Sequence, residues 1–205
     1  MTYDEIVALA LSYSDREDIE VAQAMDSFLR IVEARVNRVL HVRKMAVRAV
    51  VPTIADQEYY GLPSDFSGLR DIEIYPETAS NARTTMHYAT PEQMNTYAGV
   101  SGGTRQLYTI VADQLQIMPP KDGYLMEIVY YQKLLPLGTV NASTWLSISN
   151  PDVYVFGLLV EINSFVKDAE AKAIWDDRYK EALIDLDRED QKDRWSGTSL
   201  TIRVG

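Results

Sequence analysis

The apolar positions are densest near the C-terminal end of the chain, in residues 150–194. Residues 153–160 are apolar on nearly every side, which is typical of a helix that several neighbours bury. Pro151 stands where the first turn of such a helix tolerates proline. After a polar break, Asp168 can cap a second helix, whose apolar positions recur every three or four residues over 171–186. The segment therefore predicts a helical hairpin that needs further helices to cover it.

Two more helices are predicted at the N-terminal end of the chain. Thr2 and Glu5 have the spacing of a capping box, and Ser14 and Glu17 repeat it before a longer amphipathic run to about Val42. Together with the C-terminal hairpin these helices predict a four-helix bundle. In that bundle, Phe156 and Leu159 are expected to be buried against the helix that carries Phe28 and Val32.

A β-rich segment separates the two halves of the predicted bundle. Residues 69–75 alternate between apolar and polar side chains, as a half-buried strand does. Three further strands, at 107–111, 114–118 and 124–133, are joined by short turns and predict a meander. The predicted fold class is α+β: a bundle of four main helices with an inserted antiparallel β-rich module and an extended tail. The predicted parts are residues 1–44 (N-terminal helices), 45–144 (β-rich module), 145–194 (C-terminal hairpin) and 195–205 (tail).

The amino-acid composition argues against several classes of function. Lys and Arg number 20 against 30 Asp and Glu, so the formal net charge is -10, which argues against a general nucleic-acid binder. The absence of cysteine excludes disulfides, thiol catalysis and thiolate metal sites. No apolar run is long enough to span a bilayer, so no membrane partner is expected.

One motif resembles a catalytic sequence. Gly99 to Gly103 reads G-x-S-x-G around Ser101, but that motif needs a strand before it and a helix after it, and here the order is reversed. Only His41 and His87 could serve as a base. A flexible loop is the preferred interpretation. The acidic residues do not have the spacing of a metal loop, so we expect no catalytic residue, no metal and no cofactor.

A basic stretch without any acidic residue runs between Ala34 and Ile54. One interpretation is a DNA-binding regulatory helical protein that uses this strip. The preferred interpretation is pairing with acidic helices of the same or an adjacent subunit, which would place a subunit interface at Arg35, Arg38, Arg43, Lys44, Arg48, Asp185 and Glu189. Glu161, in the apolar helix, also needs a cation, for which Arg30, Arg35 and Arg38 are the candidates.

Beyond the last predicted helix, the tail alternates apolar and polar residues. Leu200, Ile202 and Val204 would share one face of a short strand. A lone terminal strand is unstable in water, so the tail is either a frayed end or a segment that adds to a partner.

Several segments of the chain resemble segments of a known protein family, although none is a catalytic signature. They are the Tyr60–Phe66 turn with Leu69-Arg70, the Tyr108–Pro119 hairpin, Tyr130-Tyr131, and Trp145-Leu146 followed by the Pro151–Gly157 helix, Trp175 and Tyr179. In these pieces the chain resembles the head–tail adaptor (connector) proteins of tailed bacteriophages.

The resemblance implies a virion protein of the head–tail interface that is made in the host cytoplasm. It implies a homo-oligomeric ring, usually a dodecamer, below the portal protein, and docking of the next tail component, which is a nozzle, a stopper or a second connector. Genomic DNA would pass through the lumen without sequence-specific binding, and an acidic wall would keep it from sticking. The resemblance also assigns portal contact to the C-terminal extension, here Trp195, Thr198, Leu200, Ile202, Arg203 and Val204.

Overall fold

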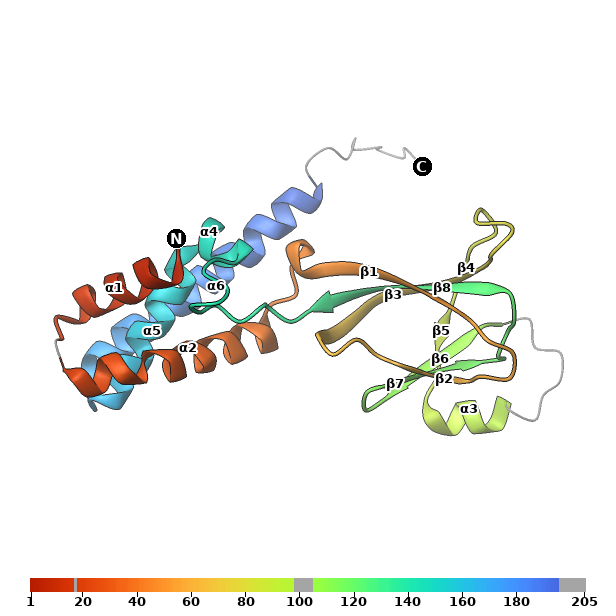
Figure 1. The fold of residues 1–205 in the computed structure, drawn as a ribbon, viewed down its shortest axis with the longest axis horizontal. Helices are drawn as coiled ribbons and strands as arrows, with labels where there is room; N and C mark the ends of the chain where they lie inside the picture. Colours follow the sequence, from red (N-terminus) through yellow and green to blue (C-terminus); the bar gives the residue numbers. More distant parts are fainter. Residues whose placement is uncertain (17, 98–104, 196–205) are drawn as a thin grey trace, which may run out of the picture. The chain divides into compact units, whose positions relative to one another are not determined.

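The computed structural model describes residues 1–16, 18–97 and 105–195. Over these ranges the protein is mixed α and β, with six α-helices and two β-sheets (Figure 1). The chain divides into two compact units, a helical unit of residues 1–44 and 134–205 and a β unit of residues 45–133. The β-rich module predicted from the sequence ends at residue 144, whereas residues 134–144 group with the helices in the structure. No helix in the described ranges is both long and apolar enough to cross a bilayer.

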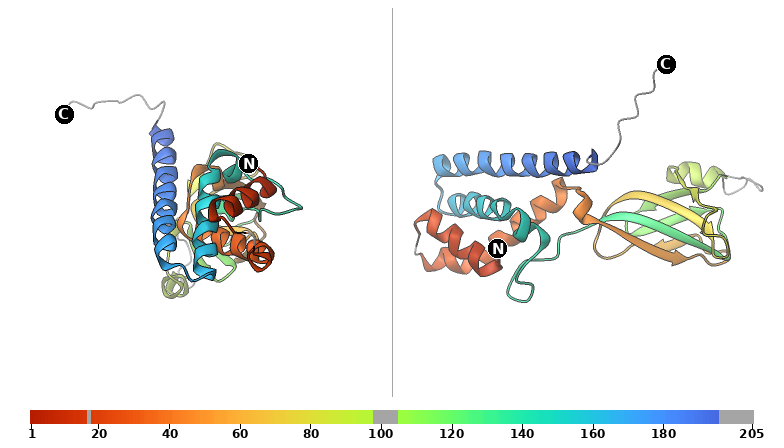
Figure 2. Two further views of the ribbon diagram at one scale, coloured as in Figure 1. Left: turned by 90° about the vertical axis from the view of Figure 1, so that its left-hand side faces the viewer. Right: turned by 90° about the horizontal axis from the view of Figure 1, so that it is seen from above.

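The helical unit is arranged around one buried helix. Its helices are α1 (Tyr3–Ser14), α2 (Ile19–Val39), α4 (Trp145–Ser149), α5 (Pro151–Phe165) and α6 (Ala169–Trp195), and a short 3-10 turn, η1 (Arg43–Met45), follows α2. Helix α5 contacts α1, α2, α4 and α6. Both views in Figure 2 place α5 between α1 and α6. Because α5 is covered on several sides, its apolar run can be continuous.

The N-terminal helix begins as the sequence predicts, but it ends differently. Thr2 and Glu5 form the reciprocal capping box of α1. Ser14, however, is the last residue of α1 and not the cap of the next helix, so that prediction is wrong. Asp15 takes the left-handed conformation, with a φ of 50°, and its N–H donates to the Ser12 carbonyl. This bond ends the helix before Ser14 can start another, and Asp18 precedes α2 instead.

The break between α5 and α6 is the one that the sequence predicts. Lys167 has a positive φ of 61°, which stops α5 from continuing into α6. Asp168 then accepts a hydrogen bond from the Ala171 N–H at 3.0 Å, which satisfies one of the free N–H groups of the first turn of α6.

The packing of α5 differs from the expected one at Phe156. Leu159 is fully buried, but Phe156 is half-buried and stacks on Trp175 of α6, with ring centroids 5.8 Å apart. Phe28 of α2 meets Phe165 edge-on at 5.5 Å instead. The sequence identifies α5 as buried on several sides, but it does not say which neighbour each side faces.

The β unit contains two four-stranded sheets. Its elements are β1 (Ala46–Pro52), β2 (Tyr59–Gly61), β3 (Phe66–Pro76), β4 (Thr84–Thr85), β5 (His87–Tyr88), α3 (Pro91–Tyr97), β6 (Leu107–Val111), β7 (Gln114–Met118) and β8 (Tyr124–Gln132). One sheet has the order β1-β8-β3-β4 and the other β2-β7-β6-β5. Strands β1 and β3 both pair antiparallel with β8. The apolar faces of the two sheets share one core. It contains Ile72 and Ile128 from the first sheet and Ile117 from the second.

The predicted three-stranded meander is wrong. Strands β6 and β7 form a hairpin, but β8 leaves their sheet and pairs with β1 and β3 on its two sides. The alternation in β8 buries Met126, Ile128 and Tyr130, which fits either arrangement. Its partners are distant in sequence, and a local pattern carries no information about such pairing.

Candidate functional site

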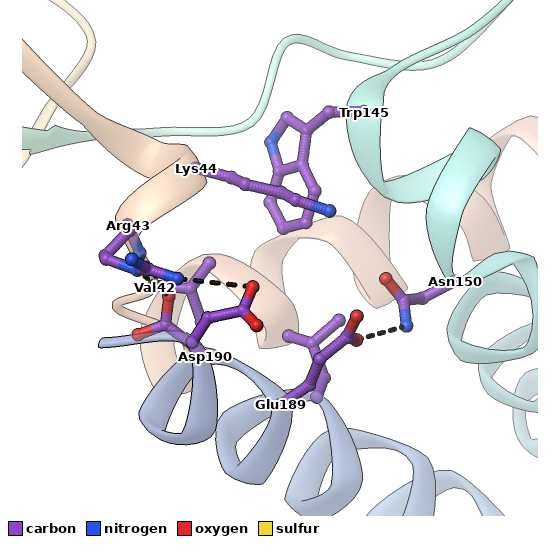
Figure 3. Close-up of a pocket in the computed structure, with 9 residues that line it drawn as sticks. Val42, Arg43, Lys44, Trp145, Asn150, Glu189 and Asp190 are labelled. Atoms are coloured by element: carbon purple, nitrogen blue, oxygen red, sulfur yellow. Dashed lines mark hydrogen bonds and ion pairs between the residues drawn. The ribbon is translucent and has the colours of Figure 1, made fainter. Parts of the chain in front are cut away.

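A hollow of the helical unit lies where the last turns of α6 pass the start of α5 and the end of the α2–η1 segment. It has a volume of about 240 Å³ and is drawn in Figure 3. We name it the Arg43 pocket. Its lining residues are Val42, Arg43, Lys44, Trp145, Asn150, Leu186, Glu189, Asp190 and Asp193.

Arg43 is tied to α6 by three polar contacts. Its backbone N–H and its Nε both donate to Oδ1 of Asp190, at 2.9 and 3.3 Å, and its Nη2 lies 3.2 Å from Oδ2 of Asp193. Asp190 is only 8% exposed, so this carboxylate is held between two helical segments rather than in solvent. A charged acceptor makes these hydrogen bonds stronger than neutral ones.

Lys44 lies across the indole of Trp145 on the other wall of the pocket (Figure 3). Its Nζ is 5.5 Å from the ring centroid and donates to Oγ of Ser149 at 3.1 Å. This is a cation–π contact at a partly exposed site, worth about 0.5–1 kcal/mol. Helix α4, which carries Trp145 and Ser149, is held by a capping box between Thr144 and Ser147.

A third contact closes the pocket between α5 and α6. Asn150 donates from Nδ2 to Oε2 of Glu189 at 3.4 Å, as Figure 3 shows. Asn150 stands at the N-terminus of α5 but makes no side-chain capping bond there. Its amide is therefore used to reach α6. The contacts of Arg43 and Asn150 tie the end of α6 to η1 and to the start of α5, and the contact of Lys44 ties η1 to α4.

The chemistry of the Arg43 pocket is that of a clamp. It brings together two cations, three carboxylates, an amide and an indole. In the part of the chain that the structure describes, no group of three His, Asp or Glu side chains could hold a metal ion. His41 and His87 are both exposed and lie outside the pocket lining, and Ser101 lies outside the described residues.

The residues of the basic strip are dispersed over different partners. Arg35 pairs with Glu161 of α5 at 2.6 Å, which is one of the pairings that the sequence analysis considered for that carboxylate. Arg38 donates to its own helix, at the Ala34 carbonyl. In the β unit, Arg48 pairs with the buried Glu127 at 3.1 Å. The strip is continuous in sequence, but Arg35, Arg38 and Arg48 contact α5, α2 and β8 respectively.

The two acidic residues assigned to a subunit interface also have contacts within the chain. Asp185 accepts from Arg188 at 3.1 Å on the exposed side of α6, and Glu189 accepts from Asn150. Trp145, Asp190 and Asp193 also line the pocket, but they are not among the site residues that the sequence predicts. The i, i+3 spacing of Asp190 and Asp193 places both on the side of α6 that meets Arg43, and that spacing was the available signal.

The predicted portal-contact residues cannot be placed. Trp195 is the last residue of α6, and its side chain lies outside the described part, as do Thr198, Leu200, Ile202, Arg203 and Val204. Their assignment stays a prediction.

Comparison with known proteins gives one match. No curated protein matches the chain. Residues 1–203 match the protein family described as SU10 adaptor protein. The match spans both units, the Arg43 pocket and nearly all of the C-terminal segment. It also agrees with the resemblance to phage head–tail adaptors that the aromatic and glycine–proline pieces indicate. The chain therefore belongs to the SU10 adaptor family, and it is a structural adaptor protein of bacteriophages.

Proposed function

We propose that this protein is a head–tail adaptor that forms a ring beneath the portal and joins it to the tail. The family match over residues 1–203 carries the proposal, because an adaptor must assemble with other virion components. The four main helices α1, α2, α5 and α6 would form a bundle in each subunit, held at one end by the Arg43 pocket. The ring would be a dodecamer of the virion, made in the host cytoplasm.

Charge supports the passage of DNA through the ring. A formal net charge of -10 on each subunit would give the assembled ring a strongly negative charge, and like charge on its inner wall would repel the phosphate backbone. DNA would then pass through the lumen without sequence-specific binding. The competing function, a DNA-binding regulator, would use Arg35 to Arg48, but Arg35, Arg43 and Arg48 each pair with a carboxylate of their own chain.

Portal contact is assigned to the C-terminal segment from Trp195 to Val204. The alternating Leu200, Ile202 and Val204 would add as a strand or dock in a groove of the portal, where main-chain bonds supply affinity. The opposite side of the ring would receive the next tail component, which is a nozzle, a stopper or a second connector.

The test is assembly on the portal. The full chain is mixed with purified portal rings of the same phage, and the mixture is examined by electron microscopy and sedimentation. The expected result is an added ring on one end of the portal. Removal of Thr198 to Gly205 should leave the melting temperature nearly unchanged but abolish binding. Failure of the full chain to join the portal would overturn the proposal. Undiminished binding by the truncated chain would move the contact to the helices.

A further inference from the structure

A long groove separates α2 from α6 on the surface of the helical unit. It consists of two adjoining hollows of about 750 and 500 Å³, which share Val39, Leu183 and Ile184 in their walls. On α6 the lining runs from Lys172 to Gln191, a span of about 28 Å at 1.5 Å per residue. We name it the α2–α6 groove. It is long enough to hold several turns of a helix.

The walls of the α2–α6 groove are apolar and incompletely covered. Val39 is 65% exposed and Ile184 is 50% exposed, although both are branched aliphatic side chains. Tyr179 lies at the base, and among the described residues its buried hydroxyl has no hydrogen-bond partner. Exposed aliphatic side chains gathered in one groove are typical of a surface that a partner covers.

The rim of the groove carries unpaired positive charge. Arg38 and Lys172 both line it, and neither makes an ion pair with any described residue. The other cations of the lining are committed, since Lys180 pairs with Asp176 at 2.6 Å, Arg35 pairs with Glu161 and Arg188 pairs with Asp185. On a chain whose net charge is -10, a groove with two cations that form no ion pair with a described residue is suited to an acidic occupant.

Helix α1 has the chemistry of that occupant. Residues 1–15 contain no Lys or Arg, and Asp4 and Glu5 are exposed on the helix. Ala8 and Ser12, one and two turns further along, are also exposed, and such small side chains allow a helix to approach closely. With 12 residues, α1 is about 18 Å long and fits within the groove.

The positions of the two surfaces fit a ring. Helix α5 contacts α1 and α6 and lies between them in both views of Figure 2, and α1 reaches α6 at its C-terminal end, where Tyr13 stacks on Trp175 at 6.1 Å. When two different patches on one subunit are complementary, copies join head to tail, and a ring results if the rotation closes. A twofold dimer would instead need one self-complementary patch.

We propose that the α2–α6 groove of one subunit receives α1 of a second copy of this chain. Asp4 then faces the cations Arg38 and Lys172, while Ala8 and Ser12 lie on Val39 and Ile184. The inference rests on the proposed ring and specifies which surfaces form its subunit contact.

Engineered cysteines provide the test, because the chain has no cysteine of its own. The full chain carrying Ala8→Cys and Ile184→Cys is oxidised with and without the portal, and the products are separated by denaturing electrophoresis. The expected result is a ladder of covalent oligomers. The matched control carries Ala8→Cys and Ile148→Cys, since Ile148 on α4 is 65% exposed but lies outside the groove lining. It should give no ladder.

A charge exchange is the second arm. Arg38→Glu should weaken self-association about tenfold, because an attraction to Asp4 becomes a repulsion. Adding Asp4→Lys should restore it, which a merely misfolded variant would not show. Rings seen by electron microscopy without a ladder from the Ala8–Ile184 pair would overturn this contact and leave the proposed ring standing. Absence of rings under every condition would overturn both.

Discussion

Gly157 of α5 lies directly against Val32 of α2. A Cβ added at Gly157 would be 2.7 Å from Cγ1 of Val32 and 3.2 Å from Cε2 of Tyr179 on α6. Real Cβ atoms essentially never lie as close as 2.7 Å to another heavy atom, and 3.2 Å is tighter than nine in ten real Cβ contacts. Helix α5 therefore meets two neighbouring helices at the one position where it has no side chain, and the closeness of the three helices depends on that glycine.

Gly157→Ala should destabilise the protein although alanine is the better helix former. The overlap with Val32 should cost about 1–3 kcal/mol, more than the gain in helix propensity of about 1 kcal/mol. Urea unfolding followed by circular dichroism measures the change. The control is the double variant with Val32→Ala, whose loss should be smaller than the sum of the two single losses. Additive losses would show that this contact does not limit the approach of the helices.

Asp168→Ala should destabilise the protein by about 1 kcal/mol, because it removes the acceptor for the Ala171 N–H at the start of α6. Asp18→Ala is the control, since Asp18 precedes α2 and makes no side-chain capping bond, and its exposed ion pair with Arg16 at 3.7 Å contributes little to stability. Both substitutions remove one acid from a helix N-terminus, so the difference between them isolates the hydrogen bond. Thermal unfolding of the two variants checks it, and equal losses would assign the effect to the helix dipole alone.

Asp190→Ala should cost more than the removal of any exposed acid of α6. It leaves the Arg43 backbone N–H and Nε without their acceptor, while Asp193 still holds Nη2, and the expected loss is about 1–3 kcal/mol. Asp185→Ala, which removes an exposed pair with Arg188, should change the free energy of unfolding by less than about 0.5 kcal/mol. Chemical denaturation of both variants tests the clamp. Equal and small effects would show that the Arg43 pocket does not hold the end of α6.

Glu33 on α2 is a buried carboxylate, 5% exposed, whose Oε1 accepts from the Leu137 N–H at 2.6 Å. Burial raises the pKa of this carboxyl above its ordinary value of 4.5, and the Leu137 hydrogen bond and Arg30 oppose that rise only in part. The folded protein therefore keeps a proton at a pH where the unfolded chain has released it. Stability is lost as the pH rises from the ordinary pKa through the raised one.

Glu33→Gln should remove this pH dependence while keeping an acceptor for Leu137. Relative to the parent protein, the free energy of unfolding of the variant should increase as the pH rises from about 4 and level off above the raised pKa of Glu33. Glu20→Gln on the exposed surface of α2 is the control for the loss of one negative charge. Denaturant unfolding at several pH values gives the difference, and a constant difference at every pH would contradict the assignment.

Local signals in the sequence predict the ends of helices well. Thr2 and Glu5, Pro151, and Asp168 mark starts because a cap acts on its own first turn. The false cap at Ser14 shows the limit. The capping-box sequence pattern also occurs there, but Asp15, the next residue, takes the left-handed conformation and ends α1.

Partners that are distant in sequence could not be predicted. The alternation in β8 identifies a strand, but nothing in residues 124–132 specifies β1 and β3 as its neighbours. Likewise Arg43 and Asp190 are 147 positions apart, and only the folded α5–α6 hairpin brings them together. In the sequence, Gly157 is one residue of an apolar run. In the structure, its lack of a side chain allows Val32 and Tyr179 to approach α5 closely.

The antiparallel pairing of β1 with β8 has a consequence for the history of the chain. Ala46 is opposite Tyr131, so the chain enters and leaves the β unit at two points that are about 5 Å apart. Because its two ends are adjacent, the folded β unit connects the two parts of the helical unit as a short turn would. The insertion therefore adds little loop-closure entropy to the cost of folding the helical unit. A module with such adjacent ends can be lengthened, replaced or exchanged between related chains without rebuilding the helices that hold it. Evolution can thus change one unit of this adaptor while the other keeps its fold.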